Sequence, residues 1–212
     1  MKNCNTPENQ TTRRILLTAC ATALAVAFTV SLPQPAHAAA RVTPPPVPAN
    51  IQVPAGNKAF LKGHAVGTQD YICLPSGSGF AWTFFGPQAT LFNNDKQVIT
   101  HFLSPNPIEN GTVRAAWQHS QDTSIVWAQV KPGNSSSDSN FVAPGTIPWL
   151  LLQVVGAQDQ PTGGHKLKAT TFVQRLNTSG GVAPSTGCTT STDVGKKALV
   201  PYKADYFFYQ AA

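Results

Sequence analysis

The fold class follows from the stretch Val200-Pro201-Tyr202-Lys203-Ala204-Asp205-Tyr206-Phe207-Phe208-Tyr209. Successive side chains of a β-strand point to opposite faces, so residues two apart share a face. One face of this stretch carries Val200, Tyr202, Ala204, Tyr206 and Phe208. The opposite face carries the charged residues Lys203 and Asp205. The pattern predicts a half-buried β-strand that is needed for the domain to fold.

Short apolar runs divided by turn residues continue this pattern upstream. The predicted strands cover residues 59–65, 69–74, 80–85, 90–93, 97–103, 112–118, 124–130, 149–155, 167–176 and 199–209. No segment offers a long apolar stripe with helical spacing. About ten short strands at this spacing are typical of an antiparallel sandwich or barrel. We therefore predict a single all-β domain.

Composition bounds the possible classes of protein. The chain has 212 residues, enough for one domain or at most two small ones. Hydrophobic residues make up 42% and charged residues 11%, which excludes a disordered chain rich in charge. The net charge is +6, but beyond the first 38 residues Lys196-Lys197 is the only adjacent basic pair. Without a basic patch, no nucleic-acid partner is predicted.

The first 38 residues have the three parts of an export signal. Lys2, Arg13 and Arg14 precede an apolar run over residues 15–30, and Ala36-His37-Ala38 follows as a small-residue cleavage site. We expect cleavage after Ala38, which would leave a periplasmic or secreted protein without a transmembrane anchor.

Two alternatives lie within the same segment. Leu17-Thr18-Ala19-Cys20 resembles a lipoprotein box, which would place a lipid on Cys20, but most of the apolar run follows this cysteine. Arg13-Arg14 loosely resembles a twin-arginine export signal. Paired arginines are also common in ordinary signal peptides, so the choice between the two export routes stays open.

Residues 39–56 are rich in proline and predict an extended lead-in, with the all-β domain covering residues 57–212. Removal of the signal would leave two cysteines, Cys73 and Cys188. A pair of cysteines in an oxidising compartment predicts a disulfide. Two buried free thiols are the alternative. Because C-x-x-C spacing is absent, the cysteines do not indicate a zinc site.

Several segments together resemble an exported family found in bacteria and fungi. They are Gly67-Thr68-Gln69-Asp70-Tyr71-Ile72-Cys73, Phe80-Ala81-Trp82, Pro87-Gln88-Ala89-Thr90-Leu91, Ile147-Pro148-Trp149-Leu150-Leu151-Leu152, Gln174-Arg175-Leu176-Asn177-Thr178-Ser179-Gly180-Gly181 and 200–209. The chain is similar to the family called domain of unknown function 3455 from about residue 53 to residue 209. Some fungal relatives carry a dehydrogenase-like name. However, Gly77-Ser78-Gly79 lacks the third glycine and the helix of a dinucleotide-binding motif, so no nicotinamide cofactor is predicted.

Polar candidates for a site gather between residues 101 and 122. They are His101, Glu109, Arg114, His119 and Asp122. His101 and His119 are candidate metal ligands or general bases, with Glu109 or Asp122 as the acid or orienting group. His64 would complete a three-histidine metal site only if folding brought it near. The alternative is that both histidines are hydrogen-bonded strand residues and that Arg114 pairs with Glu109.

Two functions from different classes follow. The first is a non-catalytic envelope or extracellular module that binds a small molecule or a glycan, or supports other components. Aromatic residues suggest a stacking platform for sugars, although core packing is the expected role of Trp82, Trp117 and Trp127. The second is a metal-dependent or His/Glu-dependent hydrolase with a site around His101, Glu109 and His119. The cofactor, if any, is not defined by the sequence.

Overall fold

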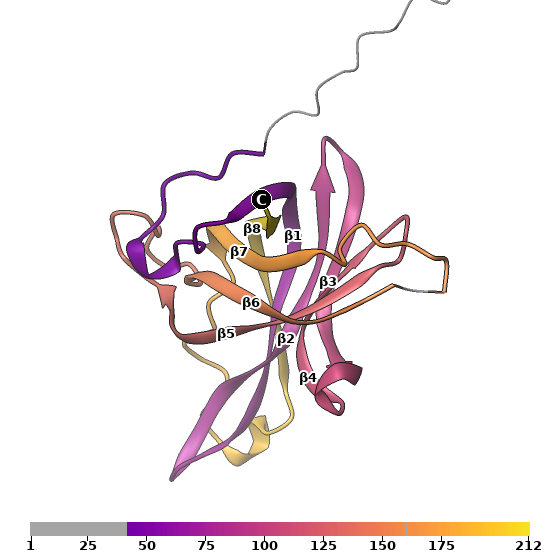
Figure 1. The fold of residues 1–212 in the computed structure, drawn as a ribbon. Coiled ribbons are helices and arrows are strands. Elements are labelled where there is room, and N and C mark those ends of the chain that lie inside the picture. Colours follow the sequence, from indigo (N-terminus) through magenta and orange to yellow (C-terminus); the bar gives the residue numbers. More distant parts are fainter. Residues whose placement is uncertain (1–41, 160) are drawn as a thin grey trace, which may run out of the picture. The chain divides into compact units, whose positions relative to one another are not determined.

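The computed structural model describes residues 42–159 and 161–212, and the predicted signal peptide lies outside this range. Eight antiparallel strands close into a single barrel in sequence order (Figure 1). The strands are β1 (Asn57–Ser76), β2 (Gly79–Asn93), β3 (Lys96–Asn106), β4 (Thr112–His119), β5 (Ile125–Ser136), β6 (Trp149–Gln158), β7 (Thr170–Gly180) and β8 (Lys197–Ala211). The predicted all-β class and antiparallel topology are confirmed.

The helices of the described chain are three short 3-10 turns, η1 (Ala49–Ile51), η2 (Pro107–Glu109) and η3 (Ser191–Asp193). None of them has the length and apolar character that a membrane-spanning helix requires.

Eight strands replace the ten predicted because two pairs of predicted strands are continuous. Residues 59–65 and 69–74 both belong to β1, and residues 80–85 and 90–93 both belong to β2. Gly67, in the gap between the predicted strands 59–65 and 69–74, lies inside the β1–β2 ladder opposite Ala89. A Cβ atom on Gly67 would lie 2.0 Å from the carbonyl oxygen of Gln88. This glycine therefore permits a close approach of two strands rather than a turn.

The barrel interior holds the larger hydrophobic core. Tyr202, Ala204, Tyr206 and Phe208 face inward from β8, as the period of two predicts. They pack with buried side chains from the other strands, including Leu91, Ile99, Trp117 and Val173. β8, which the sequence predicts to be needed for folding, thus contributes four side chains to the core inside the barrel.

A second core lies on the outer surface of the barrel. Phe207 and Tyr209 of β8 point outward but are buried together with Ile51, Trp149 and Leu176. Val42, Val47 and Val53 of the Pro-rich segment pack against this cluster. The amide of Gln174 on β7 donates to the carbonyl oxygen of Ile51 at 2.7 Å. Residues 42–53 therefore form part of the folded domain, and β8 is buried on both faces where they cover it.

The predicted disulfide joins Cys73 on β1 to Cys188, with 5.5 Å between the two Cα atoms. It holds the segment between β7 and β8 against the long β1–β2 hairpin. The indole N–H of Trp82 also donates to the carbonyl oxygen of Thr186 at 2.8 Å, on the same side of the hairpin. Trp82 is only half-buried, which differs from the core position expected for it.

Replacing both cysteines, Cys73→Ala with Cys188→Ala, should lower the free energy of unfolding by about 4 to 5 kcal/mol. The bridge closes a loop spanning 115 positions, whose closure removes entropy from the unfolded chain. Urea denaturation of the oxidised protein and the double variant measures the difference. Equal midpoints and slopes would show that the bridge contributes nothing to stability.

Candidate functional site

The barrel contains a cavity of about 140 Å³ toward the end from which the β1–β2 hairpin projects, the lower end in Figure 1. Its apolar wall includes Phe84, Leu103, Val130, Leu150 and Leu152. Its polar wall includes Gln69, His101, Trp117, Arg175 and Tyr206. Because the lining side chains come from all eight strands, the site exists only in the closed barrel.

Two polar donors at the cavity are buried without a partner. Among the described residues, neither the amide nitrogen Nε2 of Gln69 nor the indole Nε1 of Trp117 has a hydrogen-bond acceptor. The two residues are only 3% and 1% exposed, so bulk water does not replace the missing acceptor. A buried unpaired N–H group costs about 1 to 3 kcal/mol. Both residues line the cavity, so the two donors lie near any molecule bound there.

Arg175 supplies a positive charge to the same cavity. It lies on β7 between Leu150 of β6 and Tyr206 of β8, and it is half-buried. Its Nε and Nη2 both donate to the carbonyl oxygen of Pro148, at 3.2 and 2.9 Å. These bonds hold the guanidinium in place, yet no carboxylate of the described chain forms an ion pair with it.

His101 is fixed in its neutral form at the cavity wall. Its ring stacks on Trp117 with 4.3 Å between centroids, and its Nδ1 lies 2.9 Å from the carbonyl oxygen of Ala116. Since a carbonyl only accepts, Nδ1 carries the proton and Nε2 keeps a lone pair. Burial lowers the pKa of His101 to about 3; the bond to Ala116 opposes this shift and the charge of Arg175 adds to it.

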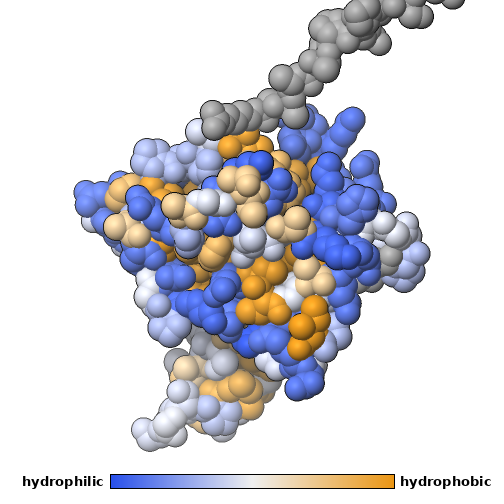
Figure 2. Space-filling view, viewed as in Figure 1, coloured by the Kyte–Doolittle hydropathy of each residue, from blue (hydrophilic) through white to orange (hydrophobic). Residues whose placement is uncertain are grey.

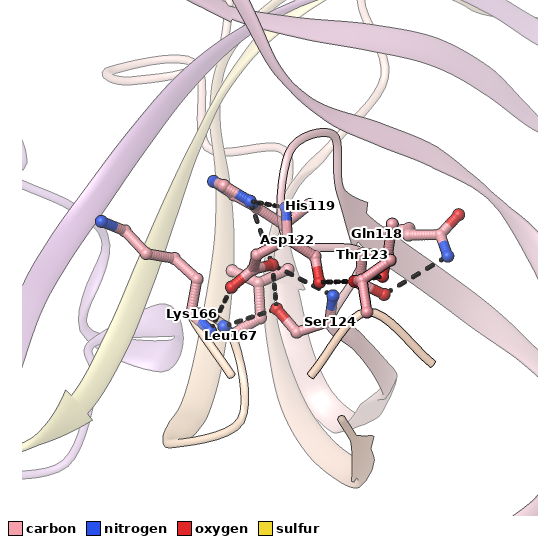
Figure 3. A network of polar contacts seen from close by, with 8 residues as sticks. Gln118, His119, Asp122, Thr123, Ser124, Lys166 and Leu167 are labelled. Carbon is pink, nitrogen blue, oxygen red and sulfur yellow. Dashed lines mark hydrogen bonds and ion pairs between the residues drawn. The ribbon is translucent and has the colours of Figure 1, made fainter. Parts of the chain in front are cut away.

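A polar network closes the opposite end of the barrel (Figure 3). The Asp122 carboxylate accepts from the Ser124 hydroxyl at 2.7 Å, the Ser124 N–H at 3.0 Å and the Lys166 N–H at 2.6 Å. The Ser124 hydroxyl in turn accepts from the N–H of Leu167 at 3.0 Å. Burial raises the pKa of Asp122, but hydrogen bonds from Ser124 and Lys166 outweigh it and hold the pKa below its usual value. The network ties the β4–β5 turn to the segment before β7.

His119 belongs to this network, but the hydrogen bonds among its residues differ from those of a Ser-His-Asp hydrolase triad. Its Nδ1 lies 3.1 Å from the Asp122 carboxylate and accepts from the Asp122 N–H at 3.2 Å. Figure 3 shows the second ring nitrogen pointing away from Asp122. The Ser124 hydroxyl bonds to Asp122, whereas in a triad the serine bonds to the histidine. This arrangement fits closure of the barrel end and does not activate the serine.

Glu109 lies apart from both histidines. It follows β3 in η2, where its carboxylate accepts from Arg114 at 2.9 and 2.8 Å and from the amide of Asn106 at 2.8 Å. The Arg114 guanidinium holds the pKa of Glu109 below its usual range. Arg114 alternates with Trp117 along β4 and therefore faces the outside of the barrel, whereas His101 faces the inside. The expected Arg114–Glu109 pair forms.

The three histidines considered as metal ligands have different partners. His64 is on the outer face of β1, where its Nδ1 lies 2.5 Å from the Asp205 carboxylate. His101 and His119 both face inward on neighbouring strands, opposite Trp117 and Ile99 respectively. Across residues 42–159 and 161–212, no group of three or more His, Cys, Asp or Glu side chains is arranged to hold a metal ion.

The sequence reasoning missed Gln69 and Arg175. A signal was present, because Arg175 shares the inward face of its strand with Val173, and a charged residue in phase with buried ones is unusual. The aromatic platform considered for sugars does not form on the surface. Trp117, Trp127, Trp149 and the four tyrosines are all buried.

Acid should destabilise the protein through His101. Between about pH 6.5 and pH 3 the unfolded chain binds a proton that the folded protein does not, so stability falls as the pH falls through this window. The slope from one such group approaches 1.4 kcal/mol per pH unit. Arg175 and Tyr206 are the ionisable side chains that face His101 across the barrel. Burial raises the pKa of Tyr206, so its hydroxyl keeps its proton throughout this window.

Urea denaturation at several pH values measures this slope. The His101→Phe variant keeps a ring against Trp117 and should show a flatter dependence than the wild type. His165→Phe, at an exposed histidine, is the matched control and should keep the wild-type slope. A His101→Phe variant as acid-sensitive as the wild type would contradict the assignment of a neutral buried histidine.

Comparison with known proteins gives one match. No curated protein and no solved structure matches the chain significantly. One family, described as Protein of unknown function (DUF3455), matches residues 54–210. The matched range begins just before β1 and ends one residue before the end of β8, so it covers the barrel except for the last residue of that strand. The chain therefore belongs to the family described as Protein of unknown function (DUF3455).

Proposed function

We propose that this protein is an exported, non-catalytic binding module whose barrel takes up a small, mostly apolar molecule. The observation that carries the proposal is the cavity of about 140 Å³ with the unpartnered donors Gln69 Nε2 and Trp117 Nε1 at its wall. An apolar cavity with a few convergent polar groups is the usual form of a small-molecule site. Export rests on the signal pattern of residues 1–38.

The width of the barrel supports this function. Eight strands give an interior that side chains can fill or that holds one small ligand. Here side chains fill the end near Leu167 and leave space beside Trp117. Cavities of roughly 150 Å³ accommodate a molecule the size of benzene. The cavity therefore fits a body of about one ring or a short branched chain.

The rim of the cavity is apolar and partly exposed. Phe84, Leu103 and Val130 line the cavity and are each at least 36% exposed. Figure 2 shows hydrophobic residues interrupting the polar surface in the lower part of the view, where the β1–β2 hairpin projects. The β2–β3 ladder ends at Ala89 and His101, so the two strands are not paired beyond this point. A ligand would enter at this end without breaking a strand ladder.

The hydrolase alternative is not supported by the arrangement of its residues. Glu109 is paired with Arg114 on the outside of the barrel, and the Nδ1 atom of His119 already accepts a backbone N–H. With a pKa of about 3, His101 is a weak base at neutral pH. None of these three residues is therefore placed to activate a nucleophile, and the cavity favours the binding function.

An NMR titration of the folded protein with toluene, benzyl alcohol and cyclohexanol tests the binding function. We expect at least one compound to shift the amide resonances of cavity residues, because each matches the volume and apolar lining. Ala115→Phe places a ring in the cavity and should abolish these shifts. Ala81→Phe, at an exposed position of β2, is the matched control. If no compound acts on the wild type, or if Ala115→Phe binds equally well, the proposal is wrong.

A further inference from the structure

Resting on the proposed binding function, we infer that the ligand is a small monocarboxylic acid. Its carboxylate would meet Arg175, and its apolar body, about the size of one ring, would lie against Leu103, Val130 and Leu152.

The first support is the unused hydrogen-bonding capacity of Arg175. A guanidinium has five N–H groups in a fixed fork, and two of them are engaged with the Pro148 carbonyl. Burial raises the pKa of Tyr206, and a hydrogen bond from Arg175 to the Tyr206 hydroxyl opposes this rise. No carboxylate of the described residues forms an ion pair with the guanidinium. A carboxylate is the anion whose two oxygens match this fork, and the pairing is stronger than a neutral hydrogen bond.

The second support is the balance of donors and acceptors around the cavity. Besides Arg175, the unpartnered groups Gln69 Nε2 and Trp117 Nε1 are both donors. The amide of Gln69 lies near the Tyr202 hydroxyl without meeting hydrogen-bond geometry. A site with a surplus of buried donors suits a ligand that brings several acceptor lone pairs, as a carboxylate does.

The third support is that Arg175 is the one charged side chain among the described residues that line the cavity. Of the other ionisable groups lining it, His101 is neutral because burial lowers its pKa to about 3, and Tyr206 keeps its proton because burial raises its pKa. Asp205 lies opposite Leu176 of the neighbouring strand but points outward to Lys62 and His64. No carboxylate within residues 42–159 and 161–212 is paired with the guanidinium, so an anionic ligand would be attracted without displacing a described salt bridge.

The lining limits the rest of the molecule. Apart from the five residues of the polar wall the lining is apolar, and the volume of about 140 Å³ leaves room for little beyond one ring. A dicarboxylic acid would bury a second charge against leucine and valine, which is costly without a partner. Monocarboxylic acids such as benzoate and hexanoate combine one charge with an apolar body of suitable size.

Paired titrations of the wild-type protein test this inference at pH 7.5, where the acids are ionised. Calorimetry compares benzoate with benzyl alcohol and hexanoate with hexanol. We expect each acid to bind at least tenfold more tightly than its alcohol. The side-chain Nε–H resonance of Arg175 should move on addition of benzoate and stay in place with benzyl alcohol. Equal affinity for acid and alcohol, or an unmoved Arg175 resonance, would overturn the inference.

The Arg175→Gln variant tests whether the preference for acids depends on the charge of Arg175. Its affinity for benzoate should fall at least tenfold relative to the wild type, so that the variant binds benzoate no better than benzyl alcohol. An acid preference that survives in this variant would overturn the role of Arg175. If the variant does not fold, the Arg175 resonance in the wild type decides the question. Binding of the alcohols without an acid preference leaves the proposed binding function standing, whereas no binding of any compound removes both.

Discussion

Pairing of β1 with β8 is the constraint on which the structure depends. The ladder runs from Asn57 opposite Ala211 to Ile72 opposite Lys197, and it closes the sheet on itself. Closure leaves no free edge in the described barrel and creates an inside that exists in no smaller unit. Gln69 on β1 and Tyr206 on β8 reach one cavity only because these two strands, distant in sequence, are neighbours.

The two ends of the barrel differ in chemistry. At one end the carboxylate of Asp122 is satisfied by three hydrogen bonds from Ser124 and Lys166, and Leu167 fills the space below it. At the other end donors remain unpartnered and apolar side chains are exposed. A network with every member satisfied stabilises and specifies a fold, whereas buried polar groups without a partner are energetically costly. The contrast favours binding at the end near Arg175.

Much of the fold could be predicted from the sequence because strand faces are set by neighbouring residues. The alternation over residues 200–209 identified the inward face of β8, and two remaining cysteines identified the disulfide. The strand count could not be read off, because Gly67 looks the same whether it makes a turn or lets two strands approach. Burial of Phe207 and Tyr209 depends on residues 42–53, which lie far away in sequence.

The site was harder to predict because residues that are close in sequence lie on different faces and ends of the barrel. His101, Glu109 and His119 are close in sequence, yet Glu109 pairs with Arg114 on the outer face and His119 belongs to the closed end. Gln69, Trp117 and Arg175 are far apart in sequence and meet only in the closed barrel. These three residues line one cavity because of the register of the strands, and short sequence motifs do not determine that register.

A crystal structure of the protein grown with benzoate tests the central claim most directly. The binding mode predicts one benzoate inside the barrel, with its carboxylate within hydrogen-bond distance of Arg175 and its ring among Leu103, Val130 and Leu152. A barrel whose interior is filled by its own side chains, or benzoate found only on the outer surface, would contradict it.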